Sequence, residues 1–173
     1  MHLSPVTPQE FDAVYSAIED SFPREERRDR EAARRLLLEG RYSLYHTVEE
    51  GERRGCVSLW RFPDFVFVEH LLTYPAYRNG GMGARVLSCL KAEGLPLVLE
   101  AEPPLTEMAI RRLGFYRRAG FLENSIAYLQ PPYREGDAPT PLVLLSYPAP
   151  LADPHTAAAV IYREVYGKNY AKA

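Results

Sequence analysis

A glycine-rich turn at residues 78–84 constrains the fold of this chain more than any other segment. The apolar residues 65–72 before it predict a strand, and residues 84–90 after it predict a helix. Glycines in the turn therefore lie at a helix N-terminus, where free N–H groups and the helix dipole favour an anion. Glycine lets the backbone approach a ligand closely, and Arg78 adds a positive charge. The turn predicts a phosphate or pyrophosphate site.

The order of residues in the turn disagrees with two known phosphate loops. A Walker loop needs a Gly-Lys-Ser/Thr end, and the turn has no lysine. A dinucleotide-binding fingerprint needs Gly-x-Gly-x-x-Gly, in a different order. The remaining pattern, Arg-x-x-Gly-x-Gly at Arg78, Gly81 and Gly83, resembles the pyrophosphate loop of the GNAT superfamily of acetyl-coenzyme A-dependent acyltransferases. On these residues alone, an ordinary glycine-rich connection stays open as the alternative.

A second segment strengthens this resemblance. Residues 115–121 read Phe-Tyr-x-x-x-Gly-Phe, which is similar to another signature of the same superfamily. The local chemistry agrees, since Thr106 is a suitable N-cap and Gly120 suits the left-handed residue that ends a helix. The intervening residues 95–102 predict a buried strand that resembles the superfamily's Leu-Glu-Val strand. The resemblance covers about residues 1–146.

Length and composition predict a globular protein of one domain. The chain has 173 residues, a hydrophobic fraction of 46% and a formal net charge of −2. We therefore expect no nucleic-acid partner, and no membrane partner because no apolar run approaches the ~20 residues that span a bilayer. The N-terminus lacks a signal-peptide pattern, and Cys56 and Cys89 suit free thiols. These features predict a cytoplasmic protein without a metal site.

The order of the predicted elements indicates an α+β fold. A capping box of Thr7 and Glu10, with Pro8 as the first helical residue, predicts a first helix. Further predicted elements are a charged helix at 25–39, strands at 44–48, 56–60, 65–73 and 95–102, a helix after Thr106, a hairpin of 126–129 with 142–145, and a helix at 153–167. We predict a single acyltransferase domain over 1–173, with a core of about 1–147 and a mixed sheet covered by helices on both faces. The resemblance implies that its central parallel strands, 65–73 and 95–102, splay apart.

Three side chains are the candidate catalytic residues. Acyl transfer from a thioester to an amine requires removal of a proton from the amine and a proton for the departing thiolate. Tyr116 is the candidate acid, because a phenol pKa near ~10 is close to that of a thiol; the resemblance places it beside the cofactor sulfur. Glu69 and Glu100 compete as the base, and Glu102 shares the side-chain parity of Glu100. A water chain in place of a base, and solvent exposure of these acids, stay open.

The resemblance also implies the residues that contact acetyl-CoA. The strand residues expected to pair with its pantetheine arm are Leu71, Leu72 and Thr73. The residues expected around its pyrophosphate are Arg78, Asn79, Gly80, Gly81, Met82, Gly83 and Ala84. The chain departs from the superfamily at residues 103–107, where an insertion replaces an asparagine that often contacts the cofactor.

We predict from these residues an N-acetyltransferase that transfers acetyl directly to a primary amine in a ternary complex. The expected acceptor is a small-molecule or peptide amine that arrives as a cation. An anionic acceptor held by arginines and a non-catalytic CoA-binding module are the alternatives. Residues 24–35 carry six arginines against four acids, which favours a solvated helix over RNA binding. Acyl chain length and oligomeric state stay open, a homodimer included.

Overall fold

Two units of regular structure follow one another along the chain. The computed structural model describes residues 1–170; the first unit is Met1–Leu95 and the second begins at Pro96. Each unit combines antiparallel strand pairs with helices, so the predicted α+β class is confirmed. The predicted single domain and the splay of two central strands concern both units together, and they stay predictions.

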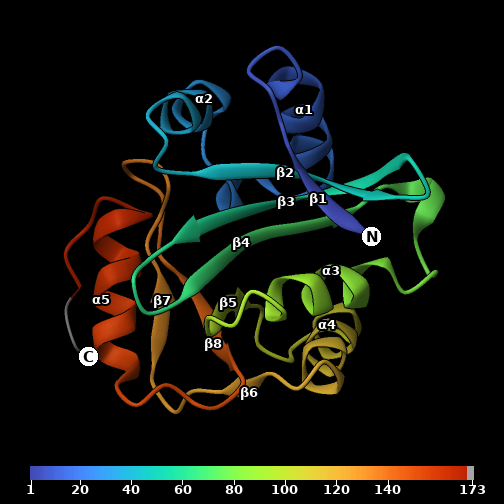
Figure 1. The fold of residues 1–173 in the computed structure, drawn as a ribbon. Coiled ribbons are helices and arrows are strands. Elements are labelled where there is room, and N and C mark those ends of the chain that lie inside the picture. The colour runs from blue at the N-terminus through green and yellow to red at the C-terminus, as the bar shows by residue number, and fades with distance from the viewer. Residues whose placement is uncertain (171–173) are drawn as a thin grey trace. The chain divides into compact units, whose positions relative to one another are not determined.

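The first unit is built on a sheet with the strand order β1-β2-β3-β4. Its antiparallel strands are β1 (His2–Pro5), β2 (Ser43–Glu49), β3 (Glu52–Arg61) and β4 (Val66–Thr73). The helices α1 (Phe11–Ser21) and α2 (Arg30–Leu38) lie on one side of this sheet, and α3 (Met82–Lys91) lies on the other (Figure 1). The sequence did not predict β1, because four residues are too few to show a period of two.

The first helix begins three residues later than predicted. The Glu10 carboxylate accepts hydrogen bonds from the Thr7 N–H (3.0 Å) and hydroxyl (2.7 Å), so the expected contact forms. Residues 8–10 nevertheless make a turn, and α1 starts at Phe11. The Thr7 hydroxyl donates to Glu10, and it therefore does not cap a helix N–H as a capping box requires.

The predicted continuous helix at 25–39 is wrong. The segment divides into a short 3₁₀ helix, η1 (Arg24–Glu26), and α2, with extended backbone at Arg27 and Asp29. Between them, the Arg28 carbonyl accepts a hydrogen bond from the Tyr15 hydroxyl (2.8 Å), and the Arg28 side chain is buried. A helix interior would use this carbonyl in its own ladder. Tertiary contacts of Arg28 therefore interrupt a segment whose composition favours a helix.

The second unit contains an antiparallel sheet in the order β5-β8-β6, with β7 paired to β8. Its strands are β5 (Leu97–Ala101), β6 (Leu122–Glu123), β7 (Tyr128–Gln130) and β8 (Thr140–Tyr147), and its helices are α4 (Glu107–Arg118) and α5 (Pro154–Glu164). As predicted, Thr106 caps α4 by accepting from the Ala109 N–H (3.1 Å), and Gly120 is left-handed with φ 81°. The helix α5 lies beside β7, where the Tyr162 hydroxyl donates to the Leu129 carbonyl (Figure 1).

Candidate active site

The helix α3 begins directly at the glycine turn of the first unit. Gly81 is its N-cap, with φ 74° and ψ 12°, a left-handed conformation that glycine adopts without steric cost. No side chain caps this helix, whereas Thr106 and Asp153 cap α4 and α5. The first N–H groups of a helix have no acceptor within the helix. The start of α3 therefore offers open donors to an anion, as the sequence predicts.

Two arginines hold the backbone around this turn. The Arg78 Nε donates to the Thr73 carbonyl (3.3 Å), and the Arg85 Nη1 donates to the Gly80 carbonyl (2.7 Å). Arg85 also forms an ion pair with Glu49 of β2 (2.7 Å). The sequence analysis missed Arg85, although its place in the first turn of α3 put a second cation beside the glycines. Arg78 adds positive potential to a helix N-terminus that already favours anions, whereas the ion pair with Glu49 offsets the charge of Arg85.

The predicted pantetheine-binding residues 71–73 form the end of β4. They pair with residues 55–57 of β3, and Leu72 is buried while Leu71 and Thr73 are half-buried. Asn79 in the turn has φ 66°, which asparagine tolerates better than most residues. Contacts of all these residues with acetyl-CoA stay predictions.

A β-bulge in β4 lets Glu69 and His70 both contact the segment between α1 and α2. The register pairs Ser58 with His70 and then Leu59 with Val68, so Glu69 is the extra residue of β4. In a regular strand, two consecutive side chains point to opposite faces, and a bulge re-aims one of them. Here Glu69 contacts Arg28, and His70 reaches the Glu26 carbonyl.

Glu69 lies in a buried ion pair. One carboxylate oxygen accepts from the Arg28 guanidinium (2.5 Å) and the other from the Trp60 indole N–H (2.9 Å). The Glu69 and Arg28 side chains are 2% and 6% exposed. The guanidinium also lies over the Trp60 ring, 5.2 Å from its centroid. Protonation of Glu69 would break this pair, so the geometry disfavours Glu69 as a proton acceptor; its catalytic role stays a prediction.

His70 completes the polar contacts beneath the bulge. Its Nδ1 lies 3.0 Å from the Ser58 hydroxyl, and its Nε2 lies 3.1 Å from the Glu26 carbonyl. Because a carbonyl only accepts, Nε2 carries the proton and Nδ1 accepts from Ser58. Burial lowers the pKa of His70, which keeps the ring neutral in this arrangement. His70 therefore fastens the η1 segment to β4.

Glu100 lies in the second unit and has a different set of donors. The hydroxyl of Tyr128 donates to one carboxylate oxygen, and the hydroxyl of Tyr166 donates to the other (2.6 Å). Neither tyrosine was among the predicted site residues. A signal for Tyr166 exists in the sequence, since Tyr162, Tyr166 and Tyr170 recur at a spacing of four, although α5 itself ends at Glu164.

Glu102 follows the last residue of β5 and has a cationic partner. The Arg112 Nη1 donates to its carboxylate at 2.8 Å, and both side chains are 36% exposed. A half-exposed pair of this kind is screened by water and salt. Glu102 therefore adds less negative potential than an unpaired acid would.

Tyr116, the predicted acid, lies in the last turns of α4. Its ring contacts Phe115 (5.1 Å between centroids) and the edge of Phe121 (5.8 Å). Burial raises the pKa of the Tyr116 phenol, and the nearby Arg112 lowers it to a smaller extent. The phenol is thus protonated at neutral pH, the state that a general acid requires.

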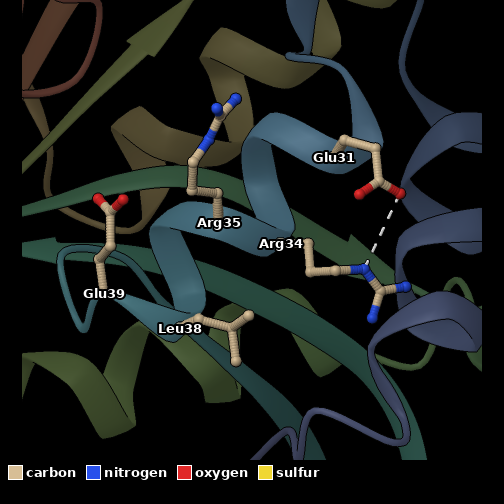
Figure 2. A pocket seen from close by; sticks show the side chains of 5 residues that line it. All are labelled: Glu31, Arg34, Arg35, Leu38 and Glu39. Carbon is tan, nitrogen blue, oxygen red and sulfur yellow. Dashed lines mark ion pairs between the residues drawn. The ribbon is translucent and has the colours of Figure 1, made fainter.

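Charged side chains of α2 line an open hollow of about 420 Å³ in the first unit. Figure 2 shows an ion pair between Glu31 and Arg34 there (4.0 Å), with Arg35 extending away from the pair. The sequence predicted a solvated helix here. The Glu31 side chain is exposed, as predicted, but Arg28, which precedes α2, is buried.

Both cysteines of the chain are free thiols. Cys56 is a buried free thiol whose pKa burial raises to about 12, and Cys89 is also free. Within residues 1–170, no three histidine, cysteine, aspartate or glutamate side chains are grouped as metal ligands are. The same residues contain no helix long and apolar enough to cross a bilayer.

Comparison with known proteins identifies one family. A model of the Acetyltransferase (GNAT) family matches residues 11–121. A protein of Bacteroides thetaiotaomicron assigned to the GNAT acetyltransferases is 34% identical, with a TM-score of 0.91 over 96% of this chain and 99% of that one. No curated protein matches the chain.

More distant solved structures share the fold alone. A GNAT family acetyltransferase from Elizabethkingia anophelis with acetyl-CoA bound is 20% identical, with a TM-score of 0.55 over 84% of this chain and 95% of that one. The ribosomal-protein-S18-alanine N-acetyltransferase of Escherichia coli is 16% identical, with a TM-score of 0.57 over 88% of this chain and 96% of that one.

Proposed function

Because this chain belongs to the GNAT family of acetyltransferases, we propose that it transfers acetyl from acetyl-CoA to a primary amine by direct attack in a ternary complex. The observation that carries this proposal is the open N-terminus of α3 at the glycine turn, where Gly81 is left-handed and no side chain caps the helix. A similar fold in Elizabethkingia anophelis holds acetyl-CoA, which supports the choice of donor.

In this proposal, the pyrophosphate accepts hydrogen bonds from the amides at the start of α3. Arg78 contributes positive charge, and Arg85 keeps the Gly80 carbonyl turned toward itself. In a trans peptide the N–H points opposite to the carbonyl, so the Gly81 N–H faces away from Arg85. The end of β4 pairs with the pantetheine arm.

Tyr116 then acts as the general acid. The neutral amine attacks the thioester carbonyl, a C–N bond forms and the C–S bond breaks, with the electron pair leaving on sulfur. The phenol of Tyr116 donates its proton to that sulfur, and the proton released by the amine returns to solvent or to the phenolate. A protonated phenol is available for this step because burial raises its pKa.

The proposed acceptor is a small-molecule or peptide amine that arrives as an ammonium ion. Glu100 is the anion proposed to attract it, with its two carboxylate oxygens held by the hydroxyls of Tyr128 and Tyr166. Attraction by a fixed charge raises the local concentration of a cation. Only the neutral amine attacks, so the rate of transfer rises with pH until the amine has lost its proton.

Thermal unfolding with acetyl-CoA tests the donor site. A ligand that binds only the native state stabilises it by about 2.7 kcal/mol at a hundredfold excess over Kd, so the wild type should melt at a higher temperature. Gly81→Val should abolish the shift, because φ is 74° and a Cβ there would lie 3.2 Å from the Arg85 guanidinium. Gly94→Val is the matched control: φ is 86°, with nothing within 4 Å. No shift with the wild type at millimolar acetyl-CoA contradicts the proposal.

Release of thiol on a panel of amines tests the chemistry. The panel compares amines of equal size whose second group is cationic, neutral or anionic, and the cationic set should react fastest. Tyr116→Phe should lower kcat by roughly 10²-fold and leave acetyl-CoA affinity unchanged. Tyr147→Phe is the control, because Tyr147 packs against the same Phe121 ring (5.8 Å). Turnover of carboxylate-bearing acceptors alone would refute the cationic acceptor.

A further inference from the structure

The hairpin between β2 and β3 ends in a tight turn with a carboxylate at its edge. Glu50 (φ 54°) and Gly51 (φ 79°) connect the two strands, and both are left-handed. Two-residue turns of this kind match the twist of paired strands and are well defined. The turn therefore holds Glu49, the last residue of β2, in one place, and its side chain is 17% exposed.

Glu49 joins two arginines that come from different elements. Its Oε1 lies 2.7 Å from the Arg85 Nε, and its Oε2 accepts from the Arg85 Nη2 (3.0 Å), so this guanidinium binds both oxygens. Oε2 also accepts from the Arg54 Nη1 of β3 (2.5 Å). A pair in which a guanidinium binds both carboxylate oxygens fixes an orientation as well as a distance. Glu49 therefore sets the direction of the Arg85 guanidinium.

A β-bulge directs Arg54 toward the segment before the glycine turn. The register between β2 and β3 shifts after Thr47, and Arg54 is the extra residue of β3. Its guanidinium lies over the ring of Tyr77, 5.3 Å from the centroid, in the short 3₁₀ helix η2 (Pro75–Tyr77). Its carbonyl accepts from the Tyr74 N–H (2.9 Å). The strand β3 thus holds the segment that leads into the glycine turn.

The third contact of Arg85 reaches the glycine turn itself. Its Nη1 donates to the Gly80 carbonyl (2.7 Å). Because Gly80 and Gly81 lack Cβ atoms, the peptide between them rotates with little steric hindrance. A hydrogen bond to its carbonyl selects one orientation, in which the Gly81 N–H points away from Arg85. Arg85 therefore fixes an amide that the proposed function offers to the pyrophosphate.

We propose that Glu49 is a positioning residue for acetyl-CoA: it orients Arg85, and Arg85 holds the peptide between Gly80 and Gly81 with its N–H toward the pyrophosphate. The inference rests on the proposed function, since it assumes that the glycine turn binds acetyl-CoA. A turn that is already held in its binding conformation loses less conformational freedom when the ligand binds, so its affinity is higher.

Charge alone predicts the opposite role for Glu49. Arg54 and Arg85 both pair with Glu49, and Glu50 and Glu52 also pair with Arg54. These two arginines and three glutamates together carry no net positive charge. An anion near a pyrophosphate weakens its binding by repulsion. A Glu49 that acted only through its charge would hinder acetyl-CoA, whereas a Glu49 that orients Arg85 assists it.

The dissociation constant of acetyl-CoA, measured by titration calorimetry on the intact chain, separates the two roles. Glu49→Gln should raise Kd about tenfold, because the two-oxygen contact with Arg85 is lost. Binding by charge alone predicts a lower Kd. A merely structural Glu49 would lower the free energy of unfolding and the number of binding-competent molecules, and Kd would stay the same. A Kd equal to or below that of the wild type overturns the inference.

Glu50→Gln is the matched control. It removes the same charge from the same turn, and the Glu50 side chain is 80% exposed and pairs with Arg54. Exposed pairs contribute little, so its Kd should change less than about twofold. A rise in Kd as large as that of Glu49→Gln would show that the turn needs its charge and not the contact with Arg85, and this result overturns the inference.

A second measurement determines whether Glu49 acts through Arg85. Arg85→Met should raise Kd at least as much as Glu49→Gln, and the double variant should bind no more weakly than Arg85→Met alone. With an amine that the wild type acetylates, kcat at saturating acetyl-CoA should stay unchanged. Losses that add in the double variant, or an Arg85→Met variant with the wild-type Kd, overturn the inference. A wild type that binds no acetyl-CoA contradicts the proposed function instead, so the two failures are distinguishable.

Discussion

Glu69 of the first unit and Glu100 of the second both accept hydrogen bonds from aromatic side chains, and Glu69 also accepts from a guanidinium. Glu69 is held by the Arg28 guanidinium and the Trp60 indole. Glu100 is held by the phenols of Tyr128 and Tyr166.

The difference in charge separates a structural acid from a candidate functional one. A guanidinium beside a buried carboxylate offsets its negative charge, and the resulting ion pair links two segments of the chain. Hydrogen bonds from phenols favour the ionised form of a carboxylate and bring no countercharge of their own. Glu69 therefore joins β4 to the segment between α1 and α2, and Glu100 is the acid that the proposed function assigns to the cationic substrate.

The largest effect is expected from Arg28→Met, which leaves Glu69 buried without its cation. Removal of one partner from a buried ion pair costs about 3–5 kcal/mol in the free energy of unfolding. Urea unfolding measures this loss. The control is the double variant Arg28→Met with Glu69→Gln, which removes both charges and should recover much of the stability. Equal stability of Arg28→Met and the wild type would contradict the structural role of Glu69.

Glu100→Gln should mainly affect catalysis. We expect kcat/KM for a cationic amine to fall by roughly 10²-fold, with acetyl-CoA affinity unchanged, because the acceptor loses its anion. Glu69→Gln is the matched carboxylate-to-amide change and should mainly lower the free energy of unfolding. Initial rates and urea unfolding are measured for both variants. The comparison fails if both variants lose the same kcat/KM and the same free energy of unfolding.

Acid should weaken the contacts by which Glu69 and His70 hold the segment between α1 and α2 against β4. Burial lowers the pKa of His70 below its ordinary value of 6.5. The unfolded chain then binds more protons than the native chain, so the contribution of His70 is complete above pH 6.5 and is lost as the pH falls below it. The free energy of unfolding should drop by about 1 kcal/mol between pH 7 and pH 5.

The His70→Gln variant should show a smaller acid-dependent drop, measured by urea unfolding at each pH. A residual slope is expected from His46, whose pKa burial also lowers. If the free energy of unfolding of the variant falls with acid as steeply as that of the wild type, His70 is not the group whose protonation weakens these contacts.

The smallest effect is expected from Arg112→Gln, which breaks the half-exposed pair with Glu102. Exposed pairs contribute about 0–1 kcal/mol, so the free energy of unfolding should change by less than about 1 kcal/mol. Urea unfolding at low and high salt measures it. A loss as large as that of Arg28→Met would show that exposure is a poor guide to the energy of these pairs.

The sequence was informative where a structure depends on neighbours in the chain. Thr106 was predicted to cap a helix and does so, because an N-cap contacts N–H groups two or three residues away. Gly120 was predicted to be left-handed and is. The glycine turn before α3 was located for the same reason.

The sequence was uninformative where partners are distant. Arg28 lies 41 positions from Glu69, and Tyr166 lies 66 positions from Glu100. No period of two or of 3.6 predicts such contacts, so the acids were identified from their strand positions but their donors were not. The break in the predicted helix at 25–39 has the same origin, since Arg28 is drawn into the fold by Glu69 and Tyr15.

The uncapped start of α3 couples occupancy of the donor site to local unfolding. A helix end without a cap opens more readily than one closed by its own side chain, as α5 is by Asp153. Under the proposed function, acetyl-CoA supplies the missing acceptors. The amides of this turn should then exchange with solvent fastest in the empty protein and slow markedly when the ligand binds. The cellular concentration of acetyl-CoA, more than the stability of the fold itself, would then determine how slowly proteases cleave this segment.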